Sequence, residues 1–155
     1  MKTEKQKLLA AELKNKIVSL KKSANLLSYS VDKCRAIGNK NDYSIQELEA
    51  FDALTSRFAR TSDLLTQKVF GLIDAILLEE PGTLIDKLNR AEKRGIITSA
   101  LIFKEIRELR NLIAHEYVNE DLNTLFQSIL KYSPILLTTV IAVESYTDTL
   151  FETDF

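Results

Sequence analysis

The residues best suited to chemistry lie together in the segment RELRNLIAHEYVNED, residues 107–121. It contains the single histidine of the chain, His115, which follows Arg110 by five positions and precedes Tyr117 by two. A histidine exchanges protons near neutral pH, and an arginine stays charged and presents paired N–H groups to phosphate oxygens. These residue types fit acid–base chemistry at a phosphodiester, and Asn111 is a further polar candidate beside Arg110.

Helix geometry leaves this interpretation open. On a straight helix Arg110 and His115 point about 140° apart, because each residue turns by about 100°. They reach one cleft only if the helix ends or distorts near His115. The same residues also have an ordinary explanation, since a histidine near a helix C-terminus is a favourable charge for the helix dipole. Asn111 and Tyr117 would then be partly buried residues without a role in chemistry.

Composition narrows the classes of protein that fit. The chain of 155 residues is 45% hydrophobic and 28% charged, which is typical of a globular protein and fits one domain over residues 1–155. Its net charge of −1 requires any anion site to be local. One cysteine and one histidine cannot form a zinc site within one chain, so we expect no metal or cofactor. Cys34 is most simply a small buried apolar residue.

The N-terminal sequence and the apolar runs indicate the compartment. The N-terminal segment MKTEKQKLLAAELKNK is too charged for a signal peptide. The longest uncharged apolar run, SPILLTTVIAV, is about half the length needed to cross a bilayer. We therefore expect a cytoplasmic protein with no membrane segment.

Apolar periodicity predicts helices along the first half of the chain. A seam of residues spaced alternately by four and three indicates one long helix that ends near AIGNKND; its members are Leu13, Ile17, Leu20, Ala24, Leu27, Val31 and Cys34. Ser44 and Glu47 form a capping box that begins a second helix, which continues to LLEEPG. The two helices are expected to form an antiparallel hairpin.

Three more helices are predicted in the second half. A short amphipathic helix occupies residues 83–95 and ends at Gly95. Thr98 or Ser99 caps a helix over residues 100–117, whose core-facing stripe is expected to be Ile102, Ile106, Leu109 and Ile113. The last helix covers residues 121–151, and Pro134 should kink or split it near Tyr132. The predicted fold is all-α, an up-and-down four-helix bundle with an additional short helix.

The motif and its setting resemble a known family. RNLIAHEY resembles the R-x4-H-x-Y signature of HEPN domains and, more narrowly, of the HepT-like toxins. The polar residue after the arginine and the position on the penultimate long helix also match. The stretches LTSRFARTSDLLTQKVFGLID and LIDKLNRAEKRGIITSA are similar to the same family, so the resemblance extends from about Leu48 to Tyr146.

This resemblance implies a metal-independent endoribonuclease toxin with a single HEPN-like domain that acts as a homodimer. It assigns acid–base catalysis to His115, phosphate binding to Arg110 and a positioning role to Asn111. It also implies a minimal nucleotidyltransferase antitoxin as the partner, which would attach AMP to Tyr117. The added bulk and negative charge would repel RNA from the cleft.

The chemistry agrees with a dimer. Cleavage without metal needs a base for the 2′-hydroxyl, an acid for the leaving 5′-oxygen and a cation for the phosphorane. One chain has only one imidazole, whereas a two-fold dimer brings two copies of His115 and of Arg110 to one groove.

Basic residues near the motif offer an RNA surface. They either line one groove or are solvated charges, many of them paired with neighbours such as Asp86, Glu92, Glu105 and Glu108. The set comprises Arg57, Arg60, Lys68, Lys87, Arg90, Lys93, Arg94, Lys104, Arg107 and Arg110.

A second function from a different class stays open. The chain would then be a non-catalytic helical partner, or substrate-binding subunit, of a nucleotidyltransferase. Such a protein should tolerate His115→Ala without loss of function. A coiled-coil-like interaction module is a third interpretation of the first seam, which is more simply the core of a bundle.

Overall fold

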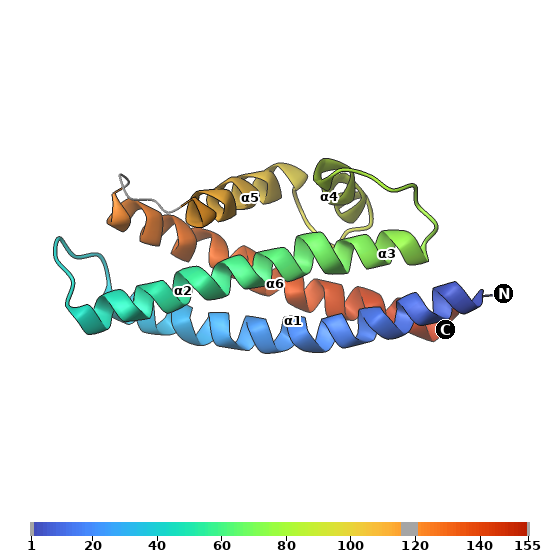
Figure 1. The fold of residues 1–155 in the computed structure, drawn as a ribbon, viewed down its shortest axis with the longest axis horizontal. Helices are drawn as coiled ribbons and strands as arrows, with labels where there is room; N and C mark the ends of the chain where they lie inside the picture. The colour runs from blue at the N-terminus through green and yellow to red at the C-terminus, as the bar shows by residue number, and fades with distance from the viewer. Residues whose placement is uncertain (1, 116–120, 155) are drawn as a thin grey trace.

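The computed structural model describes residues 2–115 and 121–154, and all regular secondary structure in these ranges is helical. The prediction of an all-α fold is therefore confirmed. The segments, shown in Figure 1, are α1 (Glu4–Ile37), α2 (Ile45–Asp63), η1 (Leu64–Val69), α3 (Phe70–Ile76), α4 (Leu84–Lys93), α5 (Ala100–Ala114) and α6 (Leu122–Asp154).

The long helices lie roughly along one axis. Helix α1 packs against α2 and α3, which with η1 form one continuous helical rod, and α6 packs against both α1 and α2. Helix α5 packs on α2, and the short α4 crosses at the end of α5 nearest α3 (Figure 1). The chain ends that the structure describes lie at the same end of the long axis.

The first two helices follow the predicted periodicity. Every member of the predicted α1 seam is buried. The predicted box of Ser44 and Glu47 caps α2, and Thr3 with Gln6 forms the same box at α1. Each box satisfies two backbone N–H groups that have no partner inside the helix. The buried stripe of α1 and the opposing phenylalanines Phe51 and Phe58 form much of the core between these helices.

The rod formed by α2, η1 and α3 contains a π-helical turn that the sequence pattern did not predict. It spans Leu64–Val69, directly after Asp63, and the N–H of Phe70 donates to the carbonyl of Leu65 five residues earlier. Turns of this kind are rare and are often found at functional sites. Asp63, which directly precedes this turn, contacts Arg110 on α5.

Helices α3 and α4 end in the same hydrogen-bond pattern. After α4, Gly95 adopts a φ of 76°, and the N–H of Ile96 donates to the carbonyl of Ala91. After α3, the corresponding left-handed residue is Leu78, with a φ of 62°, and the N–H of Glu79 donates to the carbonyl of Asp74. The stop at Gly95 was predicted, whereas a leucine at this position was not expected, because it costs about 1–2 kcal/mol there.

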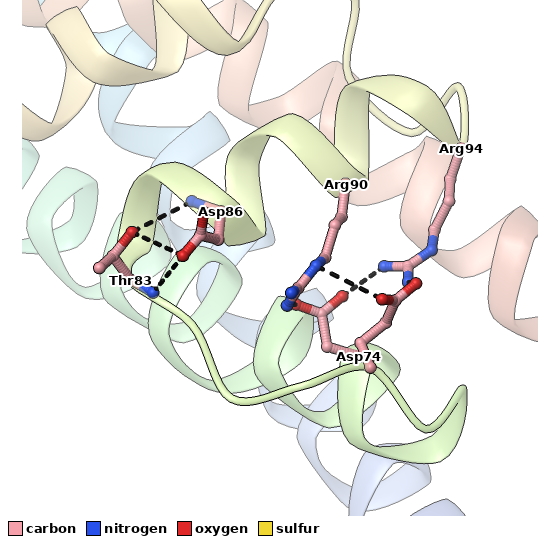
Figure 2. A network of polar contacts seen from close by, with 6 residues as sticks. Asp74, Thr83, Asp86, Arg90 and Arg94 are labelled. Carbon is pink, nitrogen blue, oxygen red and sulfur yellow. Dashed lines mark hydrogen bonds and ion pairs between the residues drawn. The ribbon is translucent and has the colours of Figure 1, made fainter.

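A polar network fixes α4 against α3, as Figure 2 shows. The carboxylate of Asp74 is only 8% exposed and receives hydrogen bonds from Arg94 and, at 3.2 Å, from Nη1 of Arg90. The more exposed Glu79 pairs with both arginines. At the start of α4, Thr83 and Asp86 form a capping box.

Two details of the predicted helices are corrected. The buried residues of α5 are Phe103, Ile106 and Leu109, while Ile102 and Ile113 are half-buried, so the core stripe begins one residue later than predicted. Of the predicted kink or split at Pro134, the split is wrong, because α6 continues through the proline from Leu122 to Asp154. Leu130 and Leu136, which flank the proline in the sequence, are both buried, and their packing helps to offset the one backbone hydrogen bond that the proline removes.

Helix α6 is long and apolar enough to cross a membrane by length and composition. The window within Leu122–Thr153 has a mean hydropathy of 1.4, and 44% of it is buried inside the molecule. A core helix of a soluble protein meets the same two criteria. The expectation of no membrane segment rested on the uncharged run SPILLTTVIAV, which is shorter than this window.

Candidate functional site

Helix α5 carries the motif and ends at the histidine. Ser99 caps its start by accepting a hydrogen bond from the N–H of Ile102 at 3.2 Å, as one of the two predicted caps. Its last helical residue is Ala114, and His115 is the C-cap, with φ −92° and ψ 19°. The helix end that would let His115 and Arg110 face one cleft is therefore present.

Arg110 is held by a carboxylate from another helix. Its Nε donates to Oδ1 of Asp63 at 2.8 Å, and its Nη2 donates to Oδ2 at 2.7 Å. This bidentate contact is among the strong, charge-assisted hydrogen-bonding arrangements that an arginine and a carboxylate form. It raises the pKa of Arg110 above its ordinary value, through the hydrogen bond and the charge of Asp63.

Asp63 is the site residue that sequence analysis missed. It is the last residue of α2, directly before the π-helical turn, and lies 47 positions from Arg110 in the chain. Nη1 of Arg107 also lies 3.6 Å from its Oδ1. Asp63 stands within a stretch that carried the family resemblance, but no local spacing pointed to its contact with Arg110.

A pocket of about 370 Å³ opens beside this ion pair. It lies along the rod of α2 and η1 on the side that faces α5, and Arg110 forms part of its wall. The lining residues are Ser56, Ala59, Arg60, Asp63, Leu64, Gln67, Lys68 and Arg110. Three of these side chains are cationic and Asp63 is the only acidic one among the described residues that line it, so the pocket has a net positive charge.

His115 and Asn111 face solvent. Both residues are exposed, and within the described part of the chain neither side chain makes a hydrogen bond or ion pair. The described contacts include no hydrogen bond between the side chains of Arg110 and His115. Tyr117 lies outside the described residues, so its predicted modification rests on sequence alone.

The other basic residues do not all join this pocket. Nη1 of Arg57 donates to Oγ of Ser30 at 2.7 Å, so Arg57 faces α1. Arg90 and Arg94 are bound in the network with Asp74. Their partners are Asp74 on α3 and Glu79 just after it, and not the expected neighbours in sequence. Lys104 lines a separate groove between α4 and α5.

No set of three or more His, Cys, Asp or Glu side chains in residues 2–115 and 121–154 is grouped closely enough to hold a metal ion. Arg60, Lys68 and Arg110 share their pocket with a single carboxylate among the described lining residues, that of Asp63. The chemistry of this pocket suits an anionic ligand.

Comparison with known proteins adds no relative. The chain matches no protein-family model, no curated protein and no solved structure. The resemblance to HEPN domains therefore rests on the motif residues and their setting alone.

Proposed function

We propose that this chain is a metal-independent endoribonuclease toxin with a HEPN-like four-helix bundle that acts as a homodimer. The observation that carries the proposal is the placement of Arg110 and His115 at the end of α5. Asp63 fixes the guanidinium at the wall of a cationic pocket, and His115 is exposed where the helix ends.

The proposed reaction uses the residue types in their ordinary roles. An imidazole of His115 takes the proton from a 2′-hydroxyl, and that oxygen attacks the adjacent phosphorus. The bond from phosphorus to the 5′-oxygen breaks, and a protonated imidazole returns a proton to this oxygen. Arg110 stabilises the added negative charge. The products are a 2′,3′-cyclic phosphate and a 5′-hydroxyl.

A second copy of the chain completes this site. Each chain contributes one imidazole, while the reaction needs both a base and an acid. An isologous contact would bring both copies of His115 and of Arg110 to one groove. Asn111, exposed one turn before His115, would position the RNA or one of the catalytic groups.

Control of the toxin is proposed to come from a minimal nucleotidyltransferase antitoxin. This partner would transfer AMP to the hydroxyl of Tyr117, releasing pyrophosphate from ATP. Because Tyr117 follows His115 by two residues, the added phosphate would repel RNA at the cleft. Incubation with such an enzyme and ATP should add one adenylyl group to wild type and none to Tyr117→Phe.

The test is growth and RNA integrity in cells that express wild type or His115→Ala at matched protein levels. His115 is the better target, because Arg110 also ties α5 to α2 through Asp63 and its loss alters packing. Glu108→Ala, at an exposed position on α5, is the matched control. Growth arrest with cleaved RNA is expected for wild type and the control, and absence of both is expected for His115→Ala. Equal toxicity of His115→Ala would overturn the proposal.

One observation favours the second candidate, a non-catalytic subunit of a nucleotidyltransferase. The ion pair with Asp63 gives Arg110 a structural role that needs no RNA. In that case all three proteins would be harmless in cells, and the chain would instead bind a nucleotidyltransferase without changing RNA.

A further inference from the structure

The pocket beside the Asp63–Arg110 pair has features that the cleavage mechanism does not use. Arg60 and Lys68 are exposed and, within the described part of the chain, neither makes a hydrogen bond or ion pair. This contrasts with Arg90 and Arg94, whose charges are balanced by Asp74 and Glu79. Two unbalanced cations therefore share one concave surface with Arg110.

The π-helical turn helps to place these cations on one face. Ser56, Arg60, Leu64 and Lys68 recur at intervals of four and all line the pocket. In an α-helix such a repeat drifts around the axis, because four residues exceed one turn. A π-helix has a wider turn, so the drift reverses across Leu64–Val69 and Lys68 stays on the face of Arg60.

The ion pair leaves donors of Arg110 available to a ligand. A guanidinium has five N–H groups, and Asp63 uses one on Nε and one on Nη2. Among the described contacts, Nη1 of Arg110 has no hydrogen-bond partner. The carboxylate faces Arg107 as well, at 3.6 Å, so two arginines offset its repulsion of an anion.

We propose that this pocket binds a backbone phosphate of single-stranded RNA next to the phosphate that is cleaved. Arg60 and Lys68 contact the phosphate oxygens, with Ser56 and Gln67 as neutral donors on the same wall. The inference rests on the proposed function for the identity of the strand. It adds a binding subsite on α2 and η1, which leads the RNA along that rod and away from His115.

The test is binding of a fluorescein-labelled 2′-O-methyl RNA 12-mer, which cannot be cleaved by attack of a 2′-hydroxyl. Fluorescence anisotropy is measured over a series of KCl concentrations for wild type and for the double variant Arg60→Gln, Lys68→Gln. The matched control is Lys22→Gln, Lys33→Gln, which removes the same charge from exposed positions on α1 outside the pocket. Circular dichroism checks that the helical content of all three proteins is equal.

The pocket variant should bind more weakly than the control. Its slope of log affinity against log salt should fall by about 0.7, because the pocket holds one phosphate and each lost phosphate contact on a single strand removes about 0.7. Equal slopes for the two variants, or no change in either, would overturn the inference.

Cleavage of unmodified RNA separates this inference from the proposed function. If wild type binds with the pocket-dependent slope but never cleaves, the subsite stands and the ribonuclease proposal fails. If wild type cleaves and both double variants bind RNA as wild type does, the ribonuclease proposal stands and the subsite is wrong.

Discussion

At the scale of single residues, the contact between Asp63 and Arg110 connects the stability of the fold to the proposed chemistry. It joins the end of α2 to the last turns of α5 through two hydrogen bonds of 2.7 and 2.8 Å. An arginine held in this way reaches a phosphate with little further loss of side-chain freedom. The carboxylate therefore acts as a positioning residue for the group proposed to bind phosphate.

Replacing this carboxylate tests the positioning role. Asp63→Asn keeps the size of the side chain but removes its charge and one acceptor, so the guanidinium loses its fixed orientation. The rate of RNA cleavage at saturating substrate should fall on the order of 10- to 100-fold. The matched control is Asp52→Asn, the same change at an exposed position on the same helix. An unchanged rate for Asp63→Asn would contradict the positioning role.

The buried thiol of Cys34 leads to a prediction about stability that does not depend on the proposed function. The thiol is fully buried, as expected from the sequence, and burial raises the pKa of Cys34 to about 11 from an ordinary value of 9.0. The unfolded chain therefore releases this proton first as pH rises. The stabilisation that the buried, protonated thiol of Cys34 contributes is complete below pH 9 and is lost towards pH 11. The loss in unfolding free energy is on the order of 2 kcal/mol.

The measurement is urea unfolding of wild type and Cys34→Ala at several values of pH between 8 and 11. Lysines and tyrosines titrate in both proteins, so the difference between their unfolding free energies isolates Cys34. That difference should shrink as pH rises. A difference that is constant with pH would show that the buried thiol keeps its ordinary pKa.

Residue types and spacing made Arg110, Asn111 and His115 candidates for the site but did not predict their surroundings. A histidine and an arginine five positions apart are visible in one stretch of sequence. The partner of Arg110 is 47 positions away, and contacts of that range follow from packing of α2 on α5. The same limit applies to Arg90 and Arg94, whose partners were expected among close neighbours on α4.

At the scale of helices, caps and apolar repeats were predictable because they depend on neighbours within a few residues. Ser44, Ser99 and Gly95 all begin or end helices where the sequence indicated. The π-helical turn and the passage of α6 through Pro134 were not predictable. Both are local departures from regular helix that packing against other helices compensates.

The end of α3 offers a stabilising substitution. Leu78 has a φ of 62° and is 77% exposed, so it carries backbone strain with little burial in return. Leu78→Gly should raise the free energy of unfolding by about 0.5–1 kcal/mol, since relief of strain exceeds the added flexibility of the unfolded chain. Leu78→Ala is the control, because it removes the side chain but keeps the strain. Equal stability of the two variants in urea unfolding would contradict this account.

The network at α4 should contribute measurably to stability. Asp74→Ala leaves Arg90 and Arg94 without their least exposed partner, and we expect a loss of about 2 kcal/mol in unfolding free energy. The control is Glu79→Ala, whose carboxylate is 43% exposed and should cost below about 1 kcal/mol. The ranking would be wrong if chemical denaturation showed the Glu79 variant to be the less stable one.

At the scale of the whole molecule, overall charge says little about RNA binding, because the net value is −1. What matters is the distribution of charge. Asp74 and Glu79 balance the charges of Arg90 and Arg94, whereas Arg60, Lys68 and Arg110 share a pocket with one carboxylate. The proposed homodimer would bring two such pockets and two histidines together, and size-exclusion chromatography with light scattering should give twice the mass of one chain.

The most direct test of the proposed activity is cleavage of labelled RNA by the purified protein in the presence of EDTA. The comparison is wild type, Glu108→Ala and His115→Ala, with the fragment ends analysed. Wild type and Glu108→Ala should produce 2′,3′-cyclic phosphate ends, and His115→Ala should be slower by about 10²–10⁴-fold. Cleavage by His115→Ala at the wild-type rate, or complete loss of wild-type cleavage in EDTA, would contradict the proposed mechanism.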